Sequence, residues 1–441
     1  MKTEVSTPKA AVLGLQHLLA MYSGSVLVPI LIGAALQFNS TQMTYLVSID
    51  IFMCGVATAL QIFTNKFFGI GLPVVLGCAV QAVAPLIMIG QKFDIQTMYG
   101  AIIAAGLFVF LIGGLFAKLR RFFPPLVTGT LITVIGLSLI PVAFQNIGGG
   151  STTAKNFGSV TNLAIGAFTV LLILAVNVWG RGFLRSIAIL VGLIAGTVLA
   201  GFFGQVSFAP VAEASWFHVP TPFYFGVPHF EWSSIATMIL ISLVSMVEST
   251  GVFFALGDIV ERKIGEQDLK KGYRAEGLAV LLGGLFNTFP YTTFSQNVGL
   301  VQLSGIKTRK PVMFSALFLV ILGLLPKIGA LATIIPAPVL GGAMLVMFGM
   351  VAVQGIRMLQ QVDFHNDKNL LVAAISIGLG LGVTVQPQIV QFLPKTIQLL
   401  FGSGILMASL SAVLLNWLFN AKTPQPEMEE ADGLNESSKS E

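Results

Sequence analysis

The sequence predicts an all-α, polytopic membrane protein with 14 membrane-spanning segments. Of its 441 residues, 55% are hydrophobic and only 10% are charged, whereas about a quarter of the residues in a soluble domain are charged. Apolar runs long enough to cross about 30 Å of hydrocarbon recur along the chain. A pattern of Pro and Gly residues also occurs twice, 213 residues apart. Together these observations exclude an ordinary soluble enzyme.

The expected segments follow one another through short connections, with no stretch long enough for a separate soluble domain. The third and tenth are interrupted by small residues, polar residues or Pro, so we expect broken helices there. In chain order the segments are 11–36, 43–63, 71–89, 96–117, 122–144, 162–178, 185–203, 233–257, 274–289, 292–304, 312–325, 328–354, 369–383 and 399–418.

The distribution of basic residues predicts the orientation. With residues 1–10 placed in the cytoplasm, 20 of the 24 Lys and Arg residues fall on the cytoplasmic side, as the positive-inside rule requires. An even number of segments then places both termini in the cytoplasm, with the protein in the plasma membrane. The polar tail 421–441 is expected to be disordered. Because the net charge of +5 comes from short loops, it does not indicate nucleic-acid binding.

An internal repeat is visible in the fifth and twelfth segments. The same offset of 213 residues lays the broken third segment, at 77–85, over 290–298 in the broken tenth. Seven segments per repeat is an odd number, so the second copy must enter the membrane from the opposite side. Inverted repeats with paired broken segments are typical of secondary transporters, and such segments mark the binding site. A channel or a structural membrane protein could also contain repeats. The repeated residues are Pro125, Gly129 and Gly136 against Pro338, Gly342 and Gly349.

Ionisable side chains at membrane depth are rare, because each costs about 2.5–3.5 kcal/mol or more at a helix centre. Glu248 lies midway along the eighth segment, with no Lys or Arg nearby in sequence. Its carboxylate could accept two parallel N–H bonds from a heterocyclic ring, or be a structural group bonded to Ser and Thr hydroxyls. Glu276 could shuttle protons or pair with Arg274 or Lys271.

Two other ionisable residues pass the same filter. His17 could relay protons or organise the site, or be a satisfied core histidine. Asp50 lies in the second segment without an obvious partner. Cys54 and Cys78 are expected to be apolar packing residues. Since no His, Cys and carboxylate spacing and no nucleophile–base pair stands out, neither a metal, nor a cofactor, nor enzyme activity is expected.

Amide side chains mark the two broken segments. Gln296 offers donors and an acceptor on one planar group, which suits the edge of a purine. The neighbouring Asn297 fits better as a partner of the broken backbone, which must be satisfied at this depth. In the symmetry-related stretch 76–85, Gln81 could face a ligand or tie the two broken segments together.

At these residues the chain resembles a known family, the nucleobase–ascorbate transporters. The stretch from Gln296 through Gly299 to Ser304 and Gly305 is similar to their signature, which reads Gln/Glu/Pro-Asn-x-Gly, four residues, then Thr and Arg/Lys/Gly. Gln16-His17, 248–251 and 76–85 look like the other blocks of the family. The likeness covers nearly the whole chain and is greatest to bacterial xanthine permeases.

The resemblance implies a 7+7 inverted-repeat fold with a core domain and a gate domain. The core would contain segments 1–4 and 8–11, which lie mostly within 11–144 and 233–325. The gate would contain segment 5 at 122–144, segments 6–7 at 162–203 and segments 12–14 at 328–420, and would form a homodimer. The broken third and tenth segments would pair as short antiparallel strands.

The resemblance also implies a site and a function. Glu248 and Gln296 would hold a purine through their side chains, with backbone groups at Ala79, Val80 and Ser295. The expected function is proton-coupled uptake of xanthine, or of urate, by alternating access. A uracil permease and an anion exchanger of the same fold are the alternatives. Supporting or proton-coupling roles would fall to His17, Gln81, Glu276, Asn297 and Ser304.

Some positions depart from the family pattern. Ser304 replaces the signature Thr and keeps the hydroxyl. Val252 stands where relatives often carry a polar residue, and Glu276 stands where xanthine-type members often carry Asp. The proton route therefore rests on Glu248 and Glu276. Gln296, where uracil-type members often carry Glu, favours xanthine or urate.

Overall fold

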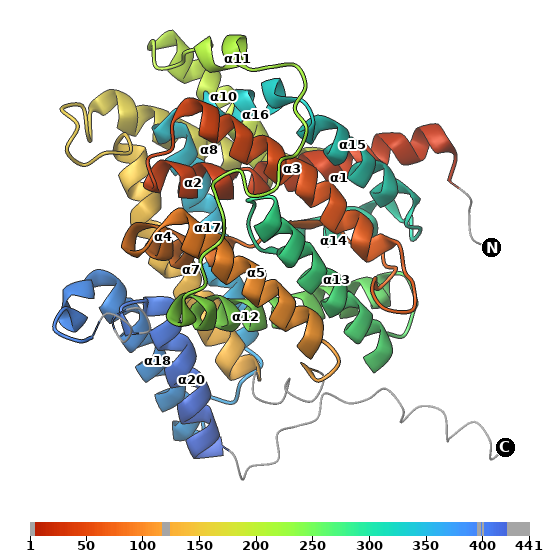
Figure 1. Ribbon diagram of the computed structural model, residues 1–441, viewed down its shortest axis with the longest axis vertical. Coiled ribbons are helices and arrows are strands. Elements are labelled where there is room, and N and C mark those ends of the chain that lie inside the picture. The colour runs from red at the N-terminus through yellow and green to blue at the C-terminus, as the bar shows by residue number, and fades with distance from the viewer. Residues whose placement is uncertain (1–4, 117–123, 395–397, 399–400, 421–441) are drawn as a thin grey trace.

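The computed structural model describes residues 5–116, 124–394, 398 and 401–420. The tail 421–441, which the sequence predicts to be disordered, lies outside these residues. The described chain is mostly helical, with one two-stranded sheet (Figure 1). Its first half contains α1 (Thr7–Ser25), α2 (Leu27–Ala35), α3 (Ser40–Ile62), β1 (Leu76–Cys78), η1 (Val80–Ala82), α4 (Val83–Lys92), α5 (Ile95–Ile112), α7 (Pro125–Gly148), α8 (Val160–Trp179), α9 (Phe183–Ser186), α10 (Ala188–Phe202) and α11 (Ala209–Glu213).

The second half has a similar order of elements. A long helix is again followed by a short strand, a short helix and a series of apolar helices. These elements are α12 (Trp232–Ile259), α13 (Glu266–Leu285), β2 (Tyr291–Thr293), α14 (Gln296–Ser304), α15 (Lys310–Gly323), α16 (Pro326–Thr333), α17 (Ala337–Leu359), α18 (Asp367–Val385), η3 (Pro387–Val390) and α20 (Gly404–Asn420).

Eight described helices are long and apolar enough to cross a membrane, or nine if the bent pair α15 and α16 is one span. The chain is therefore a multi-pass membrane protein. Six of the 14 expected segments are not among these eight helices. The third and tenth are broken, α10 and α20 are shorter apolar helices, α15 passes only together with α16, and α13 is not among the candidate spans. Local side-chain bonds set several helix starts. Asn39 and Gln42 form a capping box at α3, and Asp94 accepts from the Thr97 N–H at α5.

The two broken segments meet as the antiparallel pair β1–β2, which confirms the expected strands. Gly77 lies opposite Thr292, and all six strand residues are buried. The pairing continues beyond the strands, since the Ala79 N–H donates to the Pro290 carbonyl over 2.8 Å. Unpaired backbone groups are not tolerated at this depth, so each broken segment satisfies the other. The short helix α4 follows β1 and η1 in the chain, and the short helix α14 follows β2.

Small residues bring several helix pairs into backbone contact. The pair α7–α17 meets at Gly136, where an added Cβ would lie 2.3 Å from the Ala352 backbone nitrogen. The pair α5–α13 meets in the same way at Gly106, and α3–α15 at Gly323. Close approach at small residues is the usual basis of helix association in membranes.

The helices form two packed groups. The first contains α1 to α5 and α12 to α15, around the strand pair. The second contains α7, α8, α10, α17, α18 and α20. Figure 1 shows α18 and α20 side by side at one edge of the molecule, where both contact α7. The groups meet where α12 contacts α7 and α20, and where α1 contacts α10.

Gly136→Ala is expected to destabilise the protein, because the new Cβ would press on the α17 backbone. Overpacking of this kind costs about 1–3 kcal/mol. Gly349, at the repeated position on α17, is the matched control. A Cβ there meets nothing within 4 Å in the described part of the chain, and Ala favours a helix more than Gly does. Thermal unfolding in detergent should show a lower midpoint for Gly136→Ala alone. Equal midpoints would contradict the close α7–α17 packing.

Candidate functional site

Glu248 is half-buried midway along α12 and faces the first broken segment. Its Oε2 accepts a hydrogen bond from the Gln81 amide over 3.0 Å, and the same Gln81 nitrogen donates to the Ser245 hydroxyl over 2.8 Å. Gln81 therefore joins η1 to α12 rather than to the other broken segment. Among the described residues, the second carboxylate oxygen of Glu248 has no hydrogen-bond partner.

Ser249, the next residue on α12, bonds to the second broken segment. Its hydroxyl accepts from the Thr293 hydroxyl over 3.1 Å and lies 3.2 Å from that of Thr292. Because Ser245 and Ser249 are engaged elsewhere, Glu248 is not held by its neighbouring hydroxyls. The helix α12 is thus hydrogen-bonded to both broken segments: Ser245 and Glu248 bind the first, and Ser249 binds the second.

Gln296 is the first residue of α14, and both it and Ser295 are exposed. The Ser295 hydroxyl donates to the Gln296 side-chain oxygen over 3.4 Å. The first N–H groups of a helix lack partners within it. At α14, Asn297 and Val298 already donate their N–H groups to the Phe294 and Ser295 carbonyls. The start of the helix therefore presents the Gln296 side-chain amide and the Gln296 N–H, and α14 packs against α12. On the first broken segment, the Ala79 N–H is already used by Pro290, while Val80 is half-buried.

His17 and Asn297 form a buried pair between α1 and α14. The Asn297 amide nitrogen donates to the His17 carbonyl over 3.0 Å and lies 3.0 Å from His17 Nδ1. Since that nitrogen is a donor, His17 Nδ1 accepts and the ring proton sits on Nε2. His17 and Asn297 thus join α1 to the start of α14, and Asn297 is a partner of the α1 backbone. The Asn297 side-chain oxygen has no recorded partner and is buried.

Glu276 is buried on α13, within reach of the Ser249 hydroxyl. It forms no ion pair with Arg274 or Lys271 among the described residues, and its Oε1 has no hydrogen-bond partner. Arg274 instead lies over the ring of Phe110 at 5.9 Å. The pairing alternative for Glu276 is therefore not seen. Glu276 is therefore a second buried carboxyl near Glu248, because it lies within reach of Ser249, the residue that follows Glu248.

Ser304 lies at the opposite end of α14 from Gln296. Its hydroxyl donates to the Val301 carbonyl over 3.2 Å and accepts from the Ile306 N–H over 3.3 Å. Gly305 follows with a φ of 64°, the left-handed conformation that ends many helices. Ser304 therefore closes the helix, and the structure places it away from the ligand-facing end.

A buried network around Asp50 was not foreseen from the sequence. Asp50 Oδ1 accepts from the Cys78 thiol over 2.8 Å and from the Tyr291 hydroxyl over 3.2 Å. Cys78 and Tyr291 are partners across the strand pair, so one carboxylate holds both strands. Cys54 lies one turn from Asp50 on α3, and the ligand atoms of Asp50, Cys54 and Cys78 are within 4.8 Å of one another. Their own hydrogen bonds occupy these groups.

Asp50→Ala is expected to loosen the strand pair, because the Cys78 and Tyr291 donors lose a buried acceptor. Each such loss costs about 1–3 kcal/mol. Hydrogen–deuterium exchange should be faster in 76–78 and 291–293, and the thermal midpoint should fall. Asp50→Asn keeps the volume and one acceptor oxygen, so it should be less affected. Unchanged exchange in both strands of Asp50→Ala would show that the carboxylate does not hold them.

Comparison with known proteins identifies the relatives of this chain. The family model described as "Permease family" matches residues 8–389. The uric acid permease PucK of Bacillus subtilis is 54% identical over 96% of this chain and 98% of its own. The xanthine permease of the same organism is 53% identical over 97% and 98%, and the uric acid transporter UacT of Escherichia coli is 41% identical over 94% and 87%.

Solved structures show the same fold at low identity. The transmembrane domain of the cyanobacterial bicarbonate transporter BicA has a TM-score of 0.64 at 16% identity, over 91% of this chain and 98% of that one. Murine Slc26a9, an anion transporter in the inward-facing state, has a TM-score of 0.60 at 12% identity, over 94% and 69%. With the family model and these relatives spanning nearly its full length, the chain belongs to the permease family of nucleobase–ascorbate transporters and is a transporter, not an enzyme.

Proposed function

We propose that this chain takes up xanthine, or the related purine urate, by proton symport with an alternating-access mechanism. The observation that carries the proposal is the environment of Glu248: a half-buried carboxylate with one oxygen held by Gln81 and the other open. The names of the full-length relatives, which are uric acid and xanthine permeases, support the same class of substrate.

An oxidised purine has the complementary chemistry. Its rings are flat and carry N–H donors beside carbonyl acceptors. The open oxygen of Glu248 would accept one of these N–H groups in a charge-assisted bond, the strong kind. The exposed amide of Gln296 and the Gln296 N–H at the start of α14 would bind the carbonyl edge. The Ser295–Gln296 bond of 3.4 Å is long and easily exchanged for a ligand.

The packing supports the 7+7 inverted repeat. Exchange of the two halves converts α3–α15 into α13–α5, and α8–α10 into α18–α20, and all four pairs are in contact. The central pair α7–α17 converts into itself. The helices after the strands, α4 and α14, begin at Val83 and Gln296, again 213 residues apart. We assign the group around the strand pair as the core and the group around α7 and α17 as the gate.

The orientation and assembly follow from charge and exposure. The positive-inside bias supports our proposal that both termini lie in the cytoplasm and that the chain lies in the plasma membrane. The gate helices α8 and α18 are the least covered candidate spans, each with only 28% of its apolar window buried inside the chain. Their exposed apolar faces would meet lipid or a second copy, which fits a homodimer through the gate domains.

Proton coupling would supply the energy of accumulation. One proton gains about 2.3 kcal/mol per 100 mV of membrane potential, and a hundredfold accumulation of a neutral purine requires about 2.8 kcal/mol. A modest pH gradient closes this gap. Glu276 and Glu248 are the proton-carrying candidates, because Glu276 is buried without a cationic partner in the described structure and adjoins Glu248 through Ser249.

Glu248→Gln should abolish xanthine uptake, because the charge-assisted bond to the purine is lost. Such bonds contribute about 1.5–3 kcal/mol, which corresponds to about 10–100-fold weaker binding. Uptake of labelled xanthine in a host deficient in purine transport measures the effect, with an immunoblot of membranes to verify expression. Glu266→Gln, on the exposed start of α13, is the control and should transport normally. Robust uptake by Glu248→Gln would refute the assignment.

Glu276→Gln should separate transport from its driving force. Without the protonatable group, accumulation driven by a pH gradient should be lost, while exchange of labelled for unlabelled xanthine across proteoliposomes continues. An uncoupler should abolish accumulation by the unaltered protein and have no effect on exchange. If Glu276→Gln accumulates xanthine against a gradient as the unaltered protein does, Glu276 does not carry the coupling proton.

A further inference from the structure

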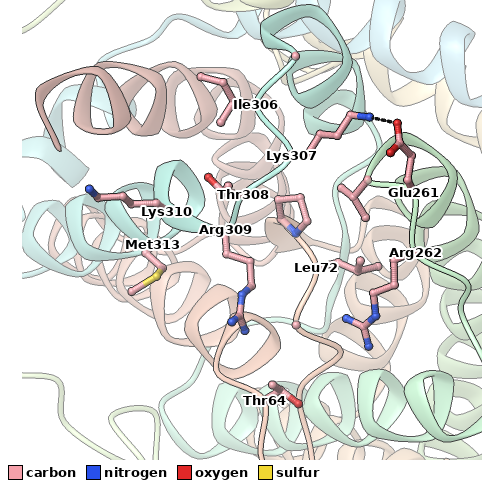
Figure 2. Close-up of a pocket in the computed structure, with 14 residues that line it drawn as sticks. Thr64, Leu72, Glu261, Arg262, Ile306, Lys307, Thr308, Arg309, Lys310 and Met313 are labelled. Atoms are coloured by element: carbon pink, nitrogen blue, oxygen red, sulfur yellow. Dashed lines mark hydrogen bonds and ion pairs between the residues drawn. The ribbon is translucent and has the colours of Figure 1, made fainter. Parts of the chain in front are cut away.

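A cavity of about 1020 Å³ lies where three connecting segments meet, at the far end of α14 from Gln296 (Figure 2). Its walls are the segment before β1, with Thr64 and 71–73, the end of α12 at 260–262, and the turn 305–310 that leads into α15. The proposed topology places this cavity on the cytoplasmic face. None of the residues assigned to the purine site lines it.

The lining is strongly basic. It contains four cationic side chains and one carboxylate, Glu261. One of the four, Lys310, is occupied elsewhere: its ammonium group donates to the Val5 carbonyl and to the Thr7 hydroxyl. In Figure 2 it points away from the two arginines. The cations left for the cavity are Arg262, Lys307 and Arg309.

Both arginines are held in place by the backbone of the segment before β1. Arg309 donates from Nη1 to the Ile62 carbonyl over 2.8 Å, and Arg262 donates to the Ile70 carbonyl over 3.0 Å. Figure 2 shows both guanidinium groups directed toward the end where Thr64 lies. A guanidinium has five N–H donors, so most of those on Arg309 are available. Arg262 also pairs with Asp268.

Glu261 has an unusual conformation for its residue type. It follows α12 with a φ of 57°, where Gly is the unstrained choice. Its carboxylate forms an ion pair with Lys307 across the cavity rim, and this hydrogen bond and charge lower the pKa of Glu261. The carboxylate neutralises Lys307 in the absence of an anion.

The Thr308 hydroxyl supplies an independent sign of a missing partner. Thr308 lines the cavity, and its oxygen is shielded from solvent with no hydrogen-bond partner in the described structure. Buried hydroxyls normally have a partner. An oxygen-rich ligand in the cavity would provide one.

We propose that this cavity binds a phosphate-bearing anion, with Arg309 and Arg262 as its principal ligands. Arginine pairs with phosphate oxygens through parallel N–H bonds, and Lys307 would exchange Glu261 for the anion. Ligand sites commonly measure about 300–1,000 Å³, so the cavity accommodates a diphosphate or a nucleotide. Two sources share this chemistry, a soluble phosphate ester and the headgroup of an anionic lipid.

Binding here would act on the purine site through the chain. The anion would bridge the segment that leads into β1 and the turn that follows α14. These are the two broken segments on which the purine site is built. An anion in the cavity would hold these two segments at a fixed separation. The anion would thereby regulate the purine site of the core domain.

Calorimetric titration of the purified full-length chain with pyrophosphate and with ATP, in neutral phosphatidylcholine nanodiscs, tests the proposal. We expect saturable binding that weakens as NaCl is raised and falls about tenfold in Arg309→Gln, because a charge-assisted contact is lost. Arg309→Lys keeps the charge but lacks the parallel N–H groups of the guanidinium, so its affinity should lie between those of the unaltered protein and Arg309→Gln. Arg357→Gln, an exposed cation of α17 outside the cavity, is the matched control and should bind normally.

A second experiment tests whether the headgroup of an anionic lipid is the anion that binds. If nanodiscs containing phosphatidylglycerol suppress pyrophosphate binding to the unaltered protein, the headgroup occupies the same cavity and the phosphate chemistry is supported. Binding that is absent in both lipid compositions would overturn the proposal. So would binding that Arg309→Gln, Arg262→Gln and Arg357→Gln all weaken equally, since that result would indicate diffuse attraction to a basic face.

Discussion

The structure depends on one constraint: two chain segments are irregular at a depth where no water can satisfy their backbone. Pairing β1 with β2 resolves this, because each strand provides the partners that the other needs. The pairing fixes where α4 and α14 begin, and therefore where the side chain and the N–H group of Gln296 lie. The binding site that we propose at the start of α14 therefore depends on this two-stranded sheet, which satisfies the other backbone groups of the broken segments.

The strand pair is fastened from both sides. On one side Asp50 on α3 accepts from Cys78 and Tyr291, which are partners in the sheet. On the other side α12 attaches through Ser249 to β2 and through Glu248 to Gln81. The second attachment uses a carboxylate that we assign to the purine. Binding the substrate would therefore alter a bond that also holds η1 to α12, which links occupancy of the site to the shape of the core.

Local patterns in the sequence predicted the two broken segments, because Pro290 and the small residues are visible over a few positions. They also identified Glu248 as a candidate, because it is a lone carboxylate in an apolar run. Partners distant in sequence could not be predicted in this way. Asp50 meets Tyr291 across 241 residues, and Asn297 meets His17 across 280. Composition also shows that a run is apolar but not whether it is straight: the expected segment 328–354 divides between α16 and α17.

The likeness to bicarbonate and anion transporters concerns the fold alone, and the side chains show why the chemistry differs. An anion bound between two half-helices needs their N-terminal N–H groups and a nearby cation. Here the helix that faces those termini carries Glu248, with Glu276 beside it and no cationic partner among the described residues. A carboxylate repels a simple anion and attracts the N–H edge of a purine.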